Sequence, residues 1–257
     1  MSRLSFWLHG PLLPLLLLQG RRTRARIPLL PEAAGPRHGT VSGGGAQMSL
    51  AVLGESTAVG VGSSRQDEAL AFCLARSLAR TRAISVDVQV VGKAGANLAH
   101  VRRELLSQVR LPVDAVVVVL GVNDTLELTR GRRWSADLGA LIAELRSSAR
   151  DVVFSGVPPL GELRSLPQPM RSALGARAAY LDARLERACA AHDVCHVPLR
   201  FPYRPEQIAR DGFHPSALGY AAWADALARA WPRRPDGEEQ NGKSHGARGK
   251  PPDHRGS

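Results

Sequence analysis

The chain has 257 residues, of which 44% are hydrophobic and 22% charged, as is usual for a soluble globular domain. Its formal net charge of +11 is unevenly spread, with +5 in residues 1–40, +2 in residues 233–257 and only +4 in residues 41–232. Because the basic residues of this central region are scattered and only 5% of the chain is aromatic, we expect no nucleic-acid partner.

The first 26 residues combine an apolar run with a basic cluster. The run, residues 4–18, is followed directly by Arg21 and Arg22 and then by two further arginines. Its fifteen residues would span about 22 Å as a helix, less than the roughly 30 Å hydrocarbon core, and Pro11 and Pro14 would interrupt that helix. We therefore expect residues 1–26 to contact a membrane surface, with the following domain in the cytoplasm. A cleaved signal peptide on a secreted protein is the alternative.

Residues 27–47 are rich in Pro, Gly and small side chains, which indicates a linker. Beyond it, short apolar runs alternate with segments of helical periodicity. Strands are predicted at 48–54, 84–91, 114–120, 152–157 and 194–199, and helices at 67–80, 97–109, 135–149, 171–191 and from Ser216 to about 231. This alternation predicts one doubly wound α/β domain over residues 48–232, with a five-stranded parallel sheet covered on both faces. The polar segment 233–257 is expected to be disordered.

The three cysteines, Cys73, Cys189 and Cys195, are widely spaced and form no CxxC pair. Neither a disulfide framework nor a zinc site is therefore expected. The run from His192 to His196 superficially resembles a metal cluster, but a strand there would direct Cys195 and His196 to opposite faces. We expect no metal and no cofactor.

Four short motifs stand where strands are predicted to end. Ser56 follows the first strand in a Gly-Glu-Ser run, Gly95 follows the second strand, and Asn123 follows the third. The fourth motif places Asp211 three residues before His214, directly ahead of the last helix. Because the carboxyl ends of parallel strands meet at one edge of a sheet, we expect these residues to gather there.

These residue types suit nucleophilic catalysis. A serine hydroxyl such as that of Ser56 needs an imidazole base, here His214, and the imidazole needs a carboxylate, here Asp211, to set its tautomer. The tetrahedral intermediate carries an oxyanion that needs converging donors. The backbone N–H groups of Ser56 and Gly95 and the side-chain amide of Asn123 are the candidates for this oxyanion hole.

In their order, the four motifs resemble those of the SGNH hydrolases, also called the GDSL esterase/lipase family. The residues that match the family's motifs are Ser56, Gly95, Asn123, Asp211 and His214. The resemblance covers roughly residues 48–231 and implies a flavodoxin-like, three-layer α/β/α fold. It also implies metal-free hydrolysis of acyl esters through an acyl-enzyme.

One position departs from the family. Its usual Gly-Asp-Ser is Gly54-Glu55-Ser56 in this chain. The aspartate of that motif is not the triad carboxylate, so the mechanism survives the change. We expect the extra methylene of Glu55 to shift the turn beside Ser56. Such a shift would affect the rate and the substrate preference more than the reaction class.

The expected partner is a small-molecule ester, and two loops, 125–134 and 158–170, indicate that it carries an acyl chain. They contain Leu126, Leu128, Trp134, Leu160, Leu163, Leu166 and Met170. Packing into the core is the alternative role for these side chains. Two other functions stay open: an acyltransferase that uses an alcohol instead of water, and a binding module that retains the fold without catalysis. The intact Ser56, Asp211 and His214 argue against the binding module.

Overall fold

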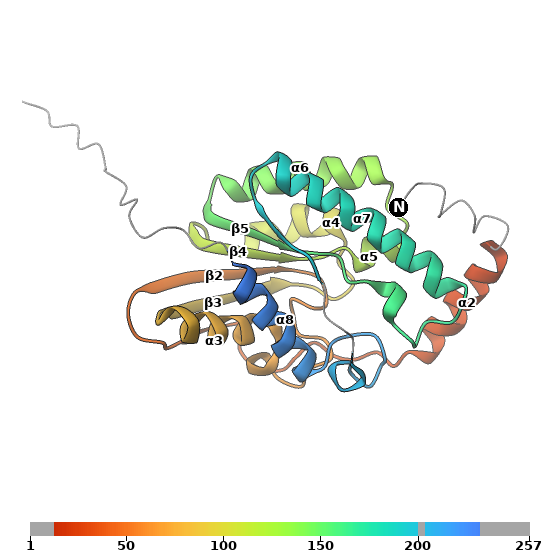
Figure 1. The fold of residues 1–257 in the computed structure, drawn as a ribbon, viewed down its shortest axis with the longest axis horizontal. Coiled ribbons are helices and arrows are strands. Elements are labelled where there is room, and N and C mark those ends of the chain that lie inside the picture. Colours follow the sequence, from red (N-terminus) through yellow and green to blue (C-terminus); the bar gives the residue numbers. More distant parts are fainter. Residues whose placement is uncertain (1–12, 200–203, 232–257) are drawn as a thin grey trace, which may run out of the picture.

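The computed structural model describes residues 13–199 and 204–231, which form a central sheet between two layers of helices (Figure 1). The strands are β1 (His38–Val41), β2 (Gln47–Gly54), β3 (Ser85–Gly92), β4 (Val113–Val119), β5 (Ala149–Ser155) and β6 (Cys195–Val197). They lie in the order β1-β3-β2-β4-β5-β6, and β2 to β6 are parallel. This order of the five parallel strands is that of flavodoxin-like sheets, so the predicted fold class is confirmed.

The sheet has one strand more than the five predicted. β1 lies in the segment predicted as a linker, and it pairs antiparallel with β3, with His38 opposite Gln89 and Val41 opposite Val86. Four residues, one of which is Gly39, are too few to show the apolar alternation of a strand. This strand is stabilised instead by its pairing with the edge of β3. The linker prediction for residues 27–47 is therefore wrong for this part of the segment.

The parallel strands divide the core into two halves through their alternating side chains. On β4, Val116 and Val118 belong to one cluster, whereas Ala115, Val117 and Val119 belong to the other. All five are fully buried, as a continuous apolar run between two helical layers requires. Figure 1 shows α6 (Gly131–Arg146) and α7 (Met170–Ala191) over one face and α3 (Leu70–Arg82) and α8 (Ala217–Ala230) over the other.

The shorter helices differ from the predicted ones at their ends. The helix predicted over 97–109 is split into α4 (Leu98–His100), a π-helical turn (Val101–Leu105) and a 3-10 turn (Leu106–Gln108). A further short helix, α5 (Val122–Leu126), follows β4 directly and was not predicted, because five residues carry no helical period. The side chains of Asn97 and Ser216 cap α4 and α8, because they accept hydrogen bonds from His100 N and Gly219 N, respectively.

Helix α2 (Leu13–Arg26) lies against the start of α7. Gln19 joins the two, since its Nε2 donates to Gln168 O at 2.7 Å and its Oε1 accepts from Met170 N at 3.2 Å. Pro14 stands in the first turn of α2, where a proline removes no helical hydrogen bond, so it does not interrupt the helix as predicted. Within the described residues, no helix combines the length and apolar character needed to cross a membrane. Residues 1–12 and the predicted disordered tail, 233–257, lie outside the described residues.

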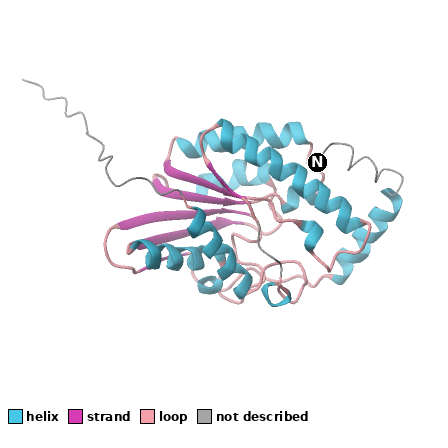
Figure 2. Cartoon of the chain, in the orientation of Figure 1, coloured by secondary structure: helices cyan, strands magenta, loops and turns pink. Residues whose placement is uncertain are grey.

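The register of the central strands determines where the motif residues lie. Gly54 at the end of β2 pairs with Gly92 of β3 on one side and with Val119 of β4 on the other. The segments that carry Ser56, Gly95 and Asn123 therefore leave three adjacent strands at the same level. This is the switch point of the sheet, where the connections diverge to opposite faces and ligands bind in such folds. Figure 2 shows that the long loops gather at this end of the strands.

Candidate active site

Ser56, His214 and Asp211 form an unbroken chain of hydrogen-bonding contacts. Ser56 Oγ lies 3.0 Å from His214 Nε2, and His214 Nδ1 lies 2.6 Å from Asp211 Oδ2. The side chain of Asp211 is 1% exposed and that of His214 19% exposed, so the carboxylate is shielded while the imidazole edge reaches solvent. This is the geometry that a serine nucleophile, its base and an orienting carboxylate require.

The chain segment around Asp211 holds its own carboxylate in place. Asp211 Oδ1 accepts hydrogen bonds from Phe213 N at 2.9 Å and from His214 N at 3.0 Å, which leaves Oδ2 for the imidazole. Burial opposes ionisation of this carboxyl, but the hydrogen bonds from the His214 ring and the two backbone N–H groups outweigh it and lower its pKa. Asp211 is therefore an anion that can stabilise a positively charged His214.

Gly62 allows the two halves of the site to meet. Its φ is +101°, and a Cβ at this position would lie 2.2 Å from Pro215 O and 3.0 Å from His214 Cβ. A side chain there would push the segment that carries His214 away from the loop that carries Ser56. The glycine-rich run after Ser56 thus has a steric reason for its composition.

Two backbone donors of the predicted oxyanion hole are free. Within the described part of the chain, neither Ser56 N nor Gly95 N donates a hydrogen bond. Gly95 has a φ of +82°, and a Cβ built on it would meet no atom within 4 Å, so the space beside its Cα is open. Both groups are available to a substrate oxygen.

The Asn123 side chain lies between the segments that carry Ser56 and Gly95. Its Nδ2 donates to Glu55 Oε2 at 2.7 Å and to Ala96 O at 3.0 Å. These contacts tie Asn123 to the residue next to Ser56 and to the residue next to Gly95. The structure therefore brings all five predicted site residues to one place.

Comparison with known proteins places the chain in one family. Residues 52–222 match the GDSL-like lipase/acylhydrolase family, and this match covers more than half of the chain. The chain belongs to this family. It is therefore a serine ester hydrolase. A GDSL-like esterase of Mycobacterium tuberculosis is 29% identical over 233 residues, which are 82% of this chain and 74% of that relative.

Solved structures of three ester hydrolases share the fold of this GDSL-family chain. A lipase/acylhydrolase from Enterococcus faecalis superposes with a TM-score of 0.55 at 22% identity and covers 71% of this chain and 94% of its own. An extracellular lipase from Streptomyces rimosus gives 0.56 at 18%, with 71% and 99% covered. A variant of an acetyl xylan esterase from Geobacillus stearothermophilus gives 0.54 at 17%, with 73% and 96% covered.

Other contacts in this GDSL-family site were not found from the sequence. Glu55 is buried and accepts from Val122 N and Asn123 N, both at 3.0 Å, although 67 and 68 residues separate the partners. The only sequence feature that indicates a role for Glu55 is its position in the family's Gly-Asp-Ser motif. Asp124 braces the same loops by accepting from Leu98 N at 2.8 Å and from Thr129 Oγ1 at 2.8 Å.

The segment predicted as a linker also supports the site. Glu32 Oε1 accepts from Ala94 N at 3.0 Å, and its other oxygen pairs with Arg37, which donates to Gly92 O. The neighbouring Gln66 side chain donates to Ala33 O at 3.1 Å, which fastens the segment to the loop after Ser56. Residues 32–37 thus hold the Gly95 loop from outside. No pattern in this Pro- and Gly-rich stretch indicates these contacts, because each is made by a single side chain across the fold.

Most of the apolar loop residues predicted to surround an acyl chain are core residues instead. Those that are buried are Trp134, Leu160, Leu163, Leu166 and Met170. They pack in the core half beneath α6 and α7, so for these residues the alternative prediction, packing into the core, is confirmed. Only Leu126 and Leu128 are exposed, at 45% and 49%, and they follow Asn123 on α5 and the turn after it.

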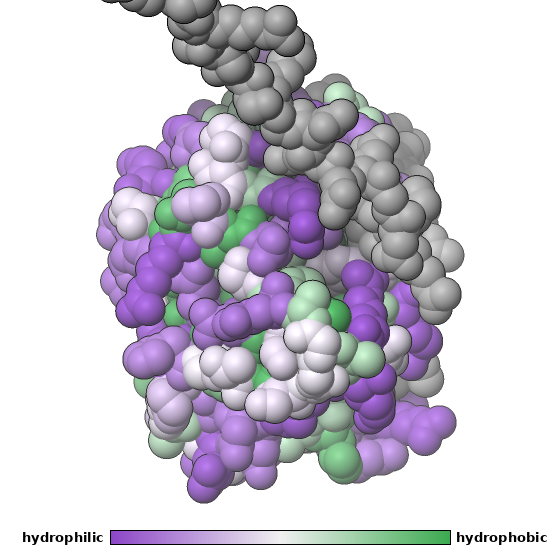
Figure 3. All heavy atoms as spheres, turned by 90° about the vertical axis from the view of Figure 1, so that its left-hand side faces the viewer, coloured by the Kyte–Doolittle hydropathy of each residue, from purple (hydrophilic) through white to green (hydrophobic). Residues whose placement is uncertain are grey.

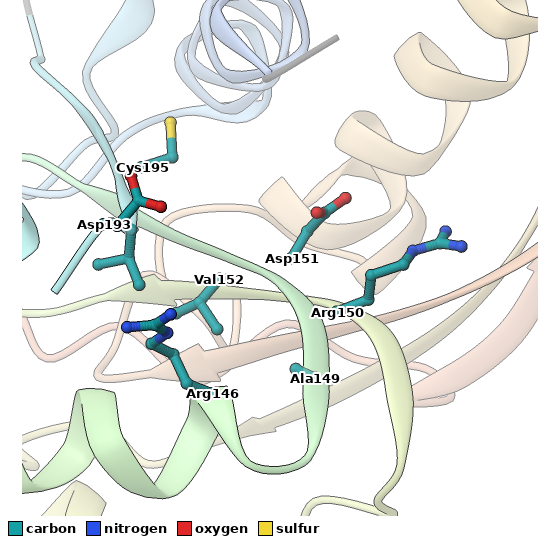
Figure 4. A pocket seen from close by; sticks show the side chains of 8 residues that line it. Arg146, Ala149, Arg150, Asp151, Val152, Asp193 and Cys195 are labelled. Atoms are coloured by element: carbon teal, nitrogen blue, oxygen red, sulfur yellow. The ribbon is translucent and has the colours of Figure 1, made fainter. Parts of the chain in front are cut away.

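A hollow of about 480 Å³ lies at the end of the sheet opposite to Ser56. Its lining comes from the end of α6 and the starts of β5 and β6, and includes Arg146, Arg150, Asp151 and Cys195 (Figure 4). Figure 3 shows that this end of the molecule is mainly hydrophilic, with apolar atoms visible between the polar ones. Arg146 donates to His192 O at 2.6 Å and Arg150 pairs with Asp114 at 3.4 Å, so both guanidinium groups have protein partners.

The residues that superficially resemble a metal cluster have a structural contact. His196 Nε2 lies 3.1 Å from Asp182 Oδ1, which also accepts from Val157 N at 2.9 Å. Burial raises the pKa values of Cys189, to about 12, and of Cys195, so both thiols stay protonated at neutral pH. Across residues 13–199 and 204–231, no three potential metal ligands come together.

Proposed function

We propose that the chain hydrolyses carboxylic esters through an acyl-enzyme on Ser56. Ser56 Oγ attacks the ester carbonyl carbon while His214 Nε2 takes the hydroxyl proton. The C–O bond of the ester then breaks, and His214 returns this proton to the leaving alcohol. Asp211 holds Nδ1–H of the ring and stabilises the imidazolium that forms. The observation that carries this proposal is the shielded hydrogen-bonded chain from Ser56 to Asp211.

The second half of the reaction uses the same groups. Water attacks the acyl-enzyme as His214 accepts its proton, and the proton passes to Ser56 Oγ when the acyl group leaves as the acid. In both halves the carbonyl oxygen becomes an oxyanion, for which Ser56 N, Gly95 N and Asn123 Nδ2 are the proposed donors. Removal of one such donor costs about 10²–10³ in kcat in a typical hydrolase.

A fluorophosphonate probe together with a p-nitrophenyl ester series tests this function. We expect the probe to modify one serine, located at Ser56 by peptide mass spectrometry, and to abolish hydrolysis of the esters in parallel. The acetate-to-palmitate series then measures the acyl length that the site accepts. Modification elsewhere, or hydrolysis that survives complete modification, would contradict the assignment. Ester products formed from added alcohols would instead identify an acyltransferase.

We further propose that the acyl chain of the substrate lies along Leu126 and Leu128. Both side chains are about half exposed and follow Asn123, whose amide is a proposed donor to the ester carbonyl. An apolar surface next to the carbonyl binds an acyl chain by removing its methylenes from water. The ester series tests this placement, since preference for acetate over all longer esters would oppose it.

We also propose that α2 holds the enzyme at an anionic membrane surface. Leu15 and Leu18 are 41% and 45% exposed, and Arg22 lies on the same helical face at the next turn. Leu16, in contrast, packs on the core. An exposed apolar pair next to basic residues is the pattern of an interfacial helix. Because α2 packs against the segment before α7, which leaves the carboxyl end of β5, this contact would place the ester site near lipid-derived substrates.

Sedimentation with phosphatidylglycerol and phosphatidylcholine vesicles tests this partner. We expect the double variant Leu15→Glu/Leu18→Glu to bind phosphatidylglycerol vesicles at least about tenfold more weakly than the wild type, because two exposed leucines no longer enter the interface. Leu111→Glu is the matched control, since Leu111 is similarly exposed but precedes β4 at the opposite end of the sheet. Equal binding of the double variant and the control would refute a role for α2.

A further inference from the structure

The Asn123 amide has no hydrogen left for a substrate. A side-chain amide carries two N–H donors. In this structure one is directed at Glu55 Oε2, 2.7 Å away, and the other at Ala96 O, 3.0 Å away. By contrast, Ser56 N and Gly95 N are free within the described residues. Two of the three proposed donors are thus ready for an oxyanion, and the third is occupied.

Glu55 reaches Asn123 from a fixed position. It directly follows β2, is 1% exposed, and its Oε1 and Oε2 each accept one backbone N–H, from Val122 and Asn123. Three N–H groups therefore converge on one carboxylate at the start of α5. An aspartate, as in the family's usual motif, is shorter by one methylene. From the same backbone it could not keep all three of these contacts.

We propose that Glu55 is a positioning residue that competes with the substrate oxyanion for the Nδ2–H of Asn123. This inference rests on the proposed function. In the resting enzyme the carboxylate orients Asn123 but also holds its amide. When the oxyanion forms, the N–H must exchange one anionic acceptor for another, and the negative charge of Glu55 beside the hole disfavours the new anion. The preformed part of the hole is then the two backbone donors alone.

Glutamate at this position also makes the competition sensitive to pH. Burial raises the pKa of Glu55 to about 7, against the hydrogen bonds from Asn123 and Val122, which lower it. The charged neighbour that acts on it is Asp124, whose buried carboxyl on α5 raises this pKa further. Above pH 7 the ionised carboxylate holds the amide more strongly, and below pH 7 the protonated form holds it less.

The variant Glu55→Asp distinguishes competition for the Asn123 amide from simple support of the Asn123 side chain. We expect kcat for p-nitrophenyl esters to rise on the order of tenfold with little change in KM, since about one hydrogen bond to the amide is removed. Glu127→Asp is the matched control. Glu127 Oε2 accepts from Asn97 Nδ2 at 2.6 Å, so the control shortens a similar Glu–Asn pair at the surface, and we expect no change in kcat.

A double-mutant cycle with Asn123→Ala tests whether Glu55 acts through Asn123. In the Asn123→Ala background, Glu55→Asp is expected to have no accelerating effect. In the wild-type background, the ratio of kcat for Glu55→Asp to kcat for the wild type is expected to grow as the pH rises through 7. A fall in kcat for Glu55→Asp, or a rise that persists without Asn123, would overturn the proposal.

A measurement on the wild-type protein does not depend on how the variant folds. The chain has three asparagines, Asn97, Asn123 and Asn241, so selective nitrogen-15 labelling gives few side-chain signals, and Asn123→Ala identifies one of them. Above pH 7 we expect both Nδ2 protons of Asn123 to exchange slowly compared with the urea-unfolded chain. An unprotected Nδ2 proton would overturn the proposal. An enzyme inactive on all esters but with both protons protected would contradict the proposed function instead.

Discussion

Ser56→Ala is expected to abolish ester hydrolysis, with kcat/KM lower by on the order of 10⁴ or more. The variant removes the only oxygen within hydrogen-bond reach of His214 Nε2 among the described residues, at 3.0 Å. Water at that position is a weaker and less well-oriented nucleophile than a serine hydroxyl. Initial rates with a p-nitrophenyl ester, extended to long incubations, measure the residual activity.

Ser64→Ala is the control for this result. Ser64 is exposed and lies in the same loop, but its Oγ contacts Glu68 at 3.0 Å rather than an imidazole. We expect it to keep wild-type rates. Both variants are expected to unfold at the wild-type temperature, because neither hydroxyl fills space in the core. Substantial turnover by Ser56→Ala would show that another group is the nucleophile.

Asp211→Asn is expected to lower kcat by on the order of 10³–10⁴, with a smaller effect on KM. Oδ1 of Asp211 accepts two backbone N–H groups, at 2.9 and 3.0 Å, so in the variant the oxygen of the amide keeps that position. The NH₂ group must then face His214 Nδ1, where it donates. The ring is forced to carry its proton on Nε2, next to Ser56 Oγ, and it no longer accepts the serine proton.

Asp182→Asn provides a matched comparison, because Asp182 Oδ1 lies 3.1 Å from His196 Nε2 in a second Asp–His pair. This pair joins α7 to β6, which is three places from β2 in the sheet, and its variant should retain kcat. The pH profile adds a further check. Since the pKa of Asp211 is lowered, the wild-type carboxylate stays ionised through the neutral range, whereas the amide of the variant never ionises. Raising the pH within that range is therefore not expected to restore the activity of Asp211→Asn, and restoration would contradict the tautomer argument.

The sequence alone was sufficient for the features that depend on local pattern. The apolar run of β4 predicts a strand covered on both faces, and its residues are buried on both sides of the sheet. The alternation of strands and helices predicts a parallel sheet, and parallel strands place their carboxyl ends at one edge. For this reason the sequence predicts that Ser56, Gly95 and Asn123 lie together. His214 joins them because its motif precedes the last helix, α8, in the same way.

Tertiary structure determines the contacts that single side chains or short segments make with distant parts of the chain. β1 is stabilised by its antiparallel pairing with the edge of β3, and its four residues show no apolar alternation of their own. The leucines of the 158–170 loop are buried because the loop folds back onto the core, which their apolar character alone leaves undetermined. Glu55 and Asn123 stand 68 residues apart, and whether one methylene lets a carboxylate reach an amide depends on the position of two loops. Such a contact is a property of three-dimensional distance, and neither propensity nor periodicity encodes it.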